Sequence, residues 1–152
     1  MRVRELMNRN LVTITESSSC REAVARMHRA RVRHLPVLKG DGTLIGVITD
    51  RDLRHHLFSP PVYQAIGTSP IDTLLQAAQV REIMSAPAVT VASSQDIVEA
   101  ARVMLKDKIG SLPVVEGGRL VGIITETDLL REICRADAAC SPEVADVVVS
   151  YP

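Results

Sequence analysis

Hydrophobic residues recur along two segments of the chain at the spacing i, i+3, i+4, i+7, which predicts a helix with one buried face. The two sets are Cys20, Ala23, Val24 and Met27, and later Ile97, Ala100, Ala101 and Met104. Each set begins at a capping box, a Ser or Asp followed three residues on by a Glu, at residues 19–22 and 96–99. We therefore expect two amphipathic helices that start at these boxes.

Short runs rich in β-branched residues lie on both sides of each expected helix and predict strands. The runs span residues 11–14, 35–38 and 44–48, and then 88–91, 112–115 and 120–124. Glycine-containing turns at 39–43 and 116–119 join the last two runs of each set, which predicts two β-hairpins. A further helix is expected after Thr49 and after Thr125. The predicted order is β-α-β-β-α, twice, in an α/β fold of the α+β type.

The two sets of elements belong to an internal duplication. Residues 3–53 align with residues 80–129 at an offset of 77, which falls to 76 at the hairpin turn. A repeat of about 50 residues is marginal as a separate domain, so we expect the copies to share a core. The expected divisions are a first repeat at 1–58, a linker at 59–79 with a short helix over 70–79, a second repeat at 80–135 and a C-terminal tail at 136–152.

Composition argues against nucleic acid and membranes as partners. The formal net charge is zero, with 11 Lys or Arg and 7 Asp or Glu in residues 1–79 and the reverse in residues 80–152. Nucleic-acid-binding domains are usually strongly basic and often carry stacking aromatic residues, whereas only Phe58, Tyr63 and Tyr151 occur here. No apolar run approaches 18 residues, and the start lacks the apolar stretch of a signal peptide.

The reactive side chains give no indication of catalysis or of a metal site. The cysteines, Cys20, Cys134 and Cys140, lack metal-ligand spacing and are typical of buried or surface thiols in a reducing cytoplasm, where we expect the protein to be. No nucleophile elbow, P-loop or His-Glu-x-x-His motif occurs. We therefore expect a protein that is not an enzyme and has no catalytic or metal-ligating residues.

Both copies contain the segment Gly-x-Ile-Thr-x-x-Asp, at 46–52 and 122–128, and its Thr-x-x-Asp part has two interpretations. Such a pair forms a capping box at the start of any helix. A strand that runs directly into a helix start also gathers backbone N–H groups where anions bind. There an Asp can accept from two ribose hydroxyls while a Thr donates to a phosphate oxygen. Because both copies keep the Gly, Ile, Thr and Asp, binding of a sugar phosphate stays open beside capping.

The doubled pattern resembles a tandem pair of cystathionine-β-synthase (CBS) domains, also called a Bateman module. The resemblance rests on the Val-Arg-Glu-(Leu/Ile)-Met lead-ins, the (His/Ser)-Leu-Pro-Val strands and the Gly-x-Ile-Thr-x-x-Asp ends. It implies two repeats packed through their sheets with pseudo-twofold symmetry, and two clefts that bind AMP, ADP, ATP or S-adenosylmethionine. It also implies a non-catalytic regulatory module that needs no cofactor, forms a homodimer and acts on an unknown downstream protein. The alternative is an interaction or oligomerisation scaffold with vestigial ligand sites.

The resemblance further implies which residues bind the ligand. Asp52 and Asp128 would hold ribose hydroxyls, and Thr49 and Thr125 would line the phosphate or ribose side. Residues of the first strands and of the proline-containing strands would surround the base: Thr13, Ile14, Thr90, Val91, His34, Pro36, Ser111 and Pro113.

The two copies differ in charge around this segment. Arg33 and Arg51 of the first copy correspond to Gly110 and Thr127 of the second, where the adjacent Glu126 adds repulsion toward anions. The arginines either form a solvated face or contact phosphate through charge-assisted bonds. We therefore expect unequal clefts, with more phosphates favoured in the cleft served by Arg33 and Arg51.

Overall fold

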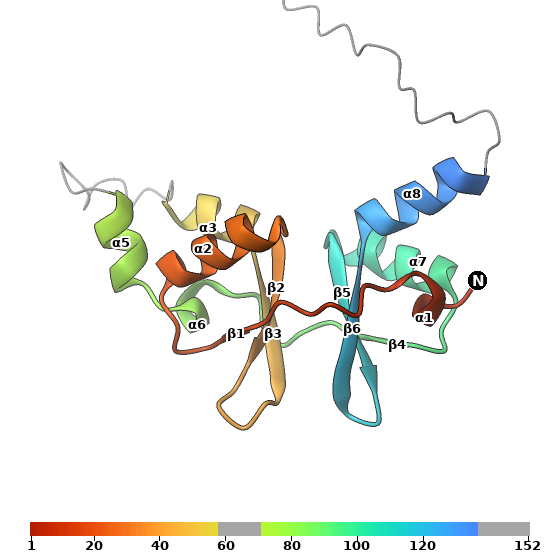
Figure 1. The fold of residues 1–152 in the computed structure, drawn as a ribbon, viewed down its shortest axis with the longest axis horizontal. Coiled ribbons are helices and arrows are strands. Elements are labelled where there is room, and N and C mark those ends of the chain that lie inside the picture. Colours follow the sequence, from red (N-terminus) through yellow and green to blue (C-terminus); the bar gives the residue numbers. More distant parts are fainter. Residues whose placement is uncertain (58–70, 137–152) are drawn as a thin grey trace, which may run out of the picture.

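The computed structural model describes residues 1–57 and 71–136, which form two units of similar build side by side (Figure 1). The hairpin strands of the two units face one another at the centre of the molecule, and the main helices lie on the outer sides. This arrangement confirms the predicted α/β fold with two repeats packed through their sheets.

The strands follow the predicted order in both repeats. The first sheet consists of β1 (Ile14–Thr15), β2 (His34–Leu38) and β3 (Leu44–Thr49), and the second of β4 (Val91–Ala92), β5 (Ser111–Glu116) and β6 (Arg119–Thr125). In each sheet the first pair is parallel and the second is an antiparallel hairpin. The turn of the second hairpin holds Gly117 and Gly118 at φ values of 54° and 79°, a conformation that glycine adopts without strain.

The helices of the described residues are α1 (Val3–Leu6), α2 (Cys20–Ala30), α3 (Asp50–Leu57), α5 (Ile71–Ala77), α6 (Val80–Ile83), α7 (Ile97–Asp107) and α8 (Glu126–Ala136). The four longest, α2, α3, α7 and α8, begin where the sequence predicts. Helix α5 covers most of the short helix predicted over 70–79. Residue 58 of the expected first repeat, residues 59–70 of the expected linker and residues 137–152 of the expected tail lie outside the described residues.

The two predicted capping boxes at α2 and α7 are only half formed. Ser19 and Asp96 accept hydrogen bonds from backbone amides of the first turn at 3.2 and 2.9 Å. The other half of each box, in which the Glu carboxylate accepts from the backbone amide of the capping residue, is not formed. An arginine one turn on competes for that carboxylate through a charge-assisted bond. The resulting pairs are Glu22 with Arg26 and Glu99 with Arg102, each at 2.7 Å.

Two hydrophobic cores, each between a sheet and its helices, replace the single shared core that the sequence predicts, and each takes residues from both linear repeats. The first is formed by Ile14, Cys20, Ala23, Met27, Leu35, Val37, Ile48, Leu53 and Val80, and the second by Val3, Met7, Val91, Ala100, Met104, Leu112, Val114 and Ile124. Val24, predicted to be buried, is 39% exposed, because the buried stripe of α2 is narrower than the apolar pattern.

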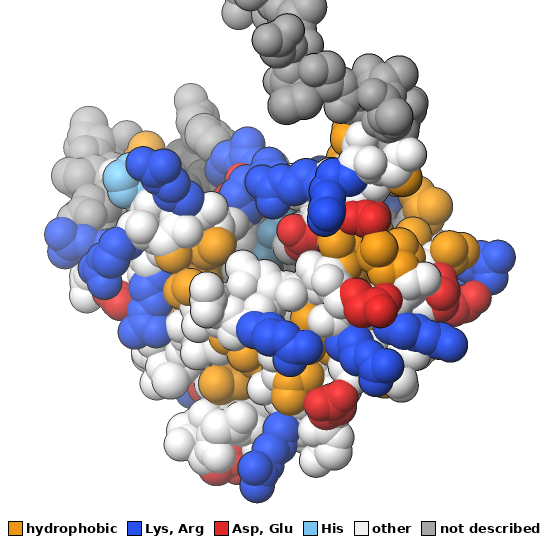
Figure 2. Space-filling model, turned by 45° about the vertical axis from the view of Figure 1, so that its right-hand side comes forward, with side chains coloured by type: hydrophobic (Ala, Val, Ile, Leu, Met, Phe, Trp, Pro, Cys, Tyr) orange, Lys and Arg blue, Asp and Glu red, His pale blue; other side chains and the backbone are white. Residues whose placement is uncertain are grey.

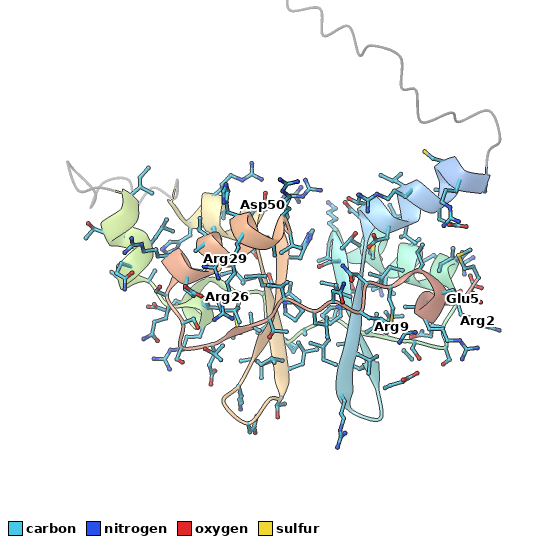
Figure 3. The ribbon with its side chains drawn as sticks, viewed as in Figure 1. Arg2, Glu5, Arg9, Arg26, Arg29 and Asp50 are labelled. Carbon is cyan, nitrogen blue, oxygen red and sulfur yellow. The ribbon has the colours of Figure 1, made fainter. Side chains whose placement is uncertain are left out.

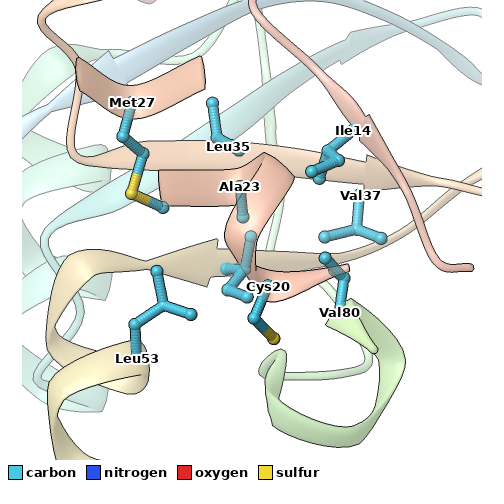
Figure 4. Close-up of a cluster of buried hydrophobic side chains, with 9 residues drawn as sticks. Ile14, Cys20, Ala23, Met27, Leu35, Val37, Leu53 and Val80 are labelled. Carbon is cyan, nitrogen blue, oxygen red and sulfur yellow. The ribbon is translucent and has the colours of Figure 1, made fainter. Parts of the chain in front are cut away.

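The short lead-in helices are exchanged between the repeats. Val80 of α6 belongs by sequence to the second repeat, yet its side chain is fully buried in the first core (Figure 4). Val3 of α1 is likewise fully buried in the second core. The backbone fixes both positions, since the amide of Val80 donates to the carbonyl of Ser18 and the amide of Val3 donates to that of Gln95, each at 2.9 Å.

Two extended segments carry the chain from one repeat to the other. Figure 3 shows Arg2, the N-cap of α1, beside the second repeat, at the opposite end of the molecule from α2. Along the crossings, Asn8 pairs with Ile123 of β6, and Ser85 pairs with Val47 of β3. The packing units therefore differ from the linear repeats, because α1 completes the second core and α6 completes the first.

Candidate functional site

Two clefts lie between the repeats, each with a volume of about 290 Å³. The first cleft surrounds Asp52 and is lined by residues 33–34, 47, 49–52, 54, 85, 87–89, 108–111 and 126. The second cleft surrounds Asp128 and is lined by residues 8, 31–34, 123, 125, 127–128 and 131. Each cleft thus combines the Thr-x-x-Asp segment of one repeat with two segments of the other. These are the lead-in and the residues that follow the end of α7 in the first cleft, or of α2 in the second.

Two hydrogen bonds hold Thr49 and Asp52 together at the junction of β3 and α3. The amide of Thr49 donates to Oδ2 of Asp52 at 2.9 Å, and the amide of Asp52 donates to Oγ1 of Thr49 at 3.0 Å. This is a complete capping box. Because the box uses Oδ2, the second carboxylate oxygen of Asp52 is available to a further donor in the cleft.

Thr125 and Asp128 repeat this geometry at the start of α8. The amide and the hydroxyl of Thr125 donate to Oδ2 of Asp128 at 2.9 and 2.7 Å, and the amide of Asp128 lies 3.3 Å from Oγ1 of Thr125. Oδ1 of Asp128 is 3.7 Å from Nη1 of Arg131. Capping therefore orients each carboxylate at a cleft wall and leaves one of its oxygens outside the box.

The connections from helix to strand bring polar residues into both clefts. The C-cap residues that follow α2 and α7 are Arg31 and Lys108, with φ values of 53° and 54° that turn the chain back toward its sheet. Residues 31–34 consequently reach the second cleft, and residues 108–111 reach the first. A β-carbon at Gly110 would lie 3.2 Å from Nε2 of His34 and 3.4 Å from Oε2 of Glu126, so His34 extends to the opposite repeat.

The structure brings many of the predicted site residues together and leaves others outside. The first cleft contains Arg33, His34, Thr49, Arg51, Asp52 and Ser111. The second contains Arg33, His34, Thr125, Thr127 and Asp128. Neither lining includes Thr13 or Thr90, which immediately precede β1 and β4. Four further residues line neither cleft because they are buried within the strands: Ile14, Pro36, Val91 and Pro113.

The lead-in segments supply cleft residues that the sequence prediction omitted. Ser85 and residues 87–89 line the first cleft, and Asn8 lines the second. Asn8 and Ser85 are equivalent positions at the repeat offset of 77, and both pair with the last hairpin strand of the other unit. The omitted residues thus lie a few positions before Thr13 and Thr90, on the exchanged segments.

The charges divide differently from the prediction. Glu126, expected to repel anions beside Asp128, lines the first cleft instead, because the start of α8 faces Gly110 and His34. The first cleft therefore has Arg33, Arg51, Arg54 and Lys108 beside Asp50, Asp52 and Glu126, whereas the second has Arg31, Arg33 and Arg131 beside Asp128. The first cleft therefore lacks the larger excess of cationic residues, and the expectation that it favours more phosphates stays a prediction. In Figure 2, basic side chains form a row across the upper part of this face of the molecule, with acidic side chains beside them.

His34 lies among charged groups of both repeats. Burial lowers the pKa of its imidazole below the usual value, and Arg33 lowers it further, while Asp50, Glu126 and Asp52 oppose the shift. The neutral form is therefore favoured in the folded protein. Among the described residues, no group of three His, Cys, Asp or Glu side chains is placed to hold a metal ion, and no helix could cross a membrane.

The pH dependence of stability should contain a contribution from His34. A histidine whose folded pKa is lowered binds fewer protons in the folded state than in the unfolded state. Stability should therefore be full above the unfolded pKa of about 6.5 and fall as the pH drops from there to the lower folded value. Urea unfolding at a series of pH values checks this by comparing the wild type with His34→Ser, the residue of the second repeat. The variant should lose less stability across that window, and equal losses would contradict the assignment.

Known proteins match the chain closely in sequence and structure. The family model described as CBS domain matches residues 3–59 and 80–135. A CBS domain-containing protein of Dictyostelium discoideum is 37% identical over 131 residues, which cover 84% of this chain and 88% of that protein. The chain spans 41% of the length of a second relative, the uncharacterized protein MJ1225 of Methanocaldococcus jannaschii. It spans 20% of the length of a third, inosine-5'-monophosphate dehydrogenase of Mycobacterium bovis.

Two solved structures with bound ligands share the fold. CBSX2 in complex with AMP has a TM-score of 0.70 and 26% identity, and the match covers 88% of this chain and 97% of that one. The CBS domain pair of protein MJ0100, in complex with 5-methylthioadenosine and S-adenosyl-L-methionine, has a TM-score of 0.69 and 26% identity over 88% and 99% of the two chains. With two matched segments, an exchanged pair of lead-in helices and two clefts between the repeats, the chain belongs to the CBS domain family.

Proposed function

We propose that this protein is a non-catalytic regulatory module that binds an adenosyl ligand, AMP, ADP, ATP or S-adenosylmethionine, in the clefts between its repeats. The observation that carries the proposal is the position of both Thr-x-x-Asp segments. Asp52 and Asp128 each line a cleft, and each is held by a capping box that engages one carboxylate oxygen. Such a preoriented carboxylate suits the vicinal hydroxyls of a ribose, which are hydrogen-bond donors.

The first cleft has the stronger case for holding the base. Its wall includes five apolar residues, Val47, Pro87, Ala88, Val89 and Ile109, whereas the second cleft has Val32 and Ile123. Apolar walls with a few polar groups are typical of small-molecule sites, whose volumes are roughly 300–1,000 Å³. The cleft volume of about 290 Å³ is close to the lower limit of that range, which favours a small ligand.

The cationic residues of both clefts support a phosphate or another anionic group on the ligand. Arg51 and Lys108 lie in the first cleft, and Arg31 and Arg131 lie in the second. Arg54 contributes less, because it is paired with Asp50 at 2.9 Å. The ligand complexes of CBSX2 and MJ0100, which hold AMP or S-adenosyl-L-methionine and 5-methylthioadenosine, favour the same ligand class.

Regulation requires that the bound state differ from the free state toward another protein or another copy of the chain. Exposed apolar side chains on the helices of the second repeat support the expected homodimer: Val98, Leu105, Leu130 and Ile133. Single exposed apolar residues are common, but these four lie on two adjacent helices, α7 and α8. We further propose an unknown downstream protein target, on the ground of the family, and a cytoplasmic location, on the ground of the cysteine pattern.

The direct test is titration calorimetry with AMP on the wild type and on Asp52→Asn. Asparagine keeps an oxygen that can accept from the amide of Thr49, so the free energy of unfolding should fall only by the charge–dipole contribution of about 0.3–1 kcal/mol. Loss of the charged acceptor should remove about 1.5–3 kcal/mol of binding, or roughly 10- to 150-fold in affinity at the first cleft.

Asp128→Asn is the matched variant and should affect the second cleft alone. Unchanged affinity in both variants would return Asp52 and Asp128 to a purely structural role as helix caps. A wild type that binds none of AMP, ADP, ATP and S-adenosylmethionine would instead favour the scaffold with vestigial sites.

A further inference from the structure

Arg33 and His34 line both clefts, whereas their counterparts in the second repeat line only one. At the repeat offset these counterparts are Gly110 and Ser111, and both are found in the first cleft and not in the second. The pseudo-twofold relation between the clefts is therefore broken at this wall. Asp52 and Asp128 each serve a single cleft, but the cation of Arg33 is common to the two.

The wall that contains Arg33 is thin and spans the repeats. His34 Nε2 lies 3.2 Å from the β-carbon position of Gly110, so the first repeat meets the second here without an intervening side chain. A β-carbon at position 110 would be in tight contact with Nε2 of His34 and would touch Oε2 of Glu126. The glycine thus allows His34 to close the partition between the two clefts.

The Arg33 backbone is anchored while its side chain is free to move. Its carbonyl accepts a hydrogen bond from the amide of Asp50 at 3.1 Å, which ties it to the start of α3 beside the capping box. Its guanidinium is exposed and makes no hydrogen bond or ion pair with any residue that the structure describes. An arginine pairs with phosphate or carboxylate oxygens through a planar fork, and a single fork cannot serve two anions fully.

We infer that Arg33 is an anion contact shared by the two clefts and that it couples them. This rests on the proposed function, because it concerns how the same clefts respond to a ligand. An anionic ligand in either cleft draws the Arg33 guanidinium to itself, and the other cleft then loses that contact. Two anionic ligands consequently bind with negative cooperativity, whereas a neutral ligand does not need the shared fork. Coupling of this kind is reciprocal, and between binding sites it is commonly 5- to 150-fold.

The experiment is calorimetric titration with ATP and with adenosine, which has no phosphate. Asp52→Asn and Asp128→Asn, each with one cleft weakened, provide the affinity of the other cleft alone. In the wild type, the second ATP should bind at least about fivefold more weakly than the matching lone cleft does. With adenosine, the affinity of the second binding event in the wild type should equal that of the matching lone cleft, so the ratio of these two affinities should be near one.

Arg33→Gln keeps most of the side chain and removes the charge, and Arg33→Gly reproduces the second repeat. In both variants ATP binding should weaken in each cleft. The ratio of the lone-cleft affinity to the affinity of the second ATP should approach one. Arg51→Ala and Arg131→Ala are the matched controls, because these arginines each line a single cleft. Each control should weaken its own cleft and keep the ratio of the wild type.

Two independent ATP sites in the wild type, or a ratio that survives in both Arg33 variants, would overturn the coupling while leaving the proposed function intact. Failure of the wild type to bind adenosine, AMP, ADP, ATP and S-adenosylmethionine would overturn both. These results are distinguishable in the same titrations, because the first shows two binding events and the last shows none.

Discussion

Val80→Asp should lower the free energy of unfolding by about 3–5 kcal/mol, the range observed when a buried charge is left without a partner. Val80 is fully buried among the residues of the first core, although it lies in the lead-in of the second repeat. Stabilities of native proteins are roughly 5–15 kcal/mol, so the loss is a large part of the total. Urea unfolding measures the loss, and amide hydrogen exchange locates it.

The location of the damage distinguishes the exchanged arrangement from a simple pair of repeats. Exchange should accelerate first in β2 and β3, and Val3→Asp should accelerate it first in β5 and β6. The control is Arg81→Asp, because Arg81 is exposed on the same helix and surface changes are usually within about 0.5 kcal/mol. If Val80→Asp loosened β5 and β6 first, the assignment of α6 to the first core would be wrong.

Gly46→Ala should cost about 1–3 kcal/mol of stability, the usual cost of overpacking, and lower the melting temperature by roughly 2–4 °C per kcal/mol. A β-carbon at Gly46 would lie 2.6 Å from the carbonyl oxygen of Ser85. That oxygen accepts a hydrogen bond from the amide of Val47 at 3.0 Å, so the segment cannot retreat without losing the bond. Because Ser85 lines the first cleft, the substitution should also weaken binding there.

Gly122→Ala is the matched control in the second repeat. Its β-carbon would lie 2.6 Å from Sδ of Met7, a flexible side chain that can move at lower cost, and 3.1 Å from the carbonyl oxygen of Asn8, farther than the 2.6 Å between Gly46 and the Ser85 oxygen. We therefore expect a smaller loss of stability for Gly122→Ala, measured by thermal and urea unfolding of both variants. Equal losses would show that the Ser85 carbonyl yields as easily as the Met7 side chain.

The sequence was sufficient to predict the local elements and the duplication. Helix periodicity, glycine turns and the Thr-x-x-Asp segments are local signals, and the starts of α2, α3, α7 and α8 follow from them. The exchange of α1 and α6 was not predicted, because the two lead-ins have nearly the same sequence. Val3 and Val80 occupy equivalent positions, so the pattern does not say which core each one enters. For the same reason the prediction assigned Glu126 to the cleft of Asp128. Only the path of the chain between the repeats determines which cleft each residue enters.

The exchanged lead-ins have a consequence for the order in which the protein folds during synthesis. Domains generally fold as their residues emerge from the ribosome, the N-terminal part first. Here the first core lacks a member until Val80 emerges, and α1, although made first, packs on β6, which ends at Thr125. Until then Val3 and Met7 have no core to enter. The earliest apolar residues of the chain are therefore among the last to leave water, and completion of the second repeat closes the whole fold.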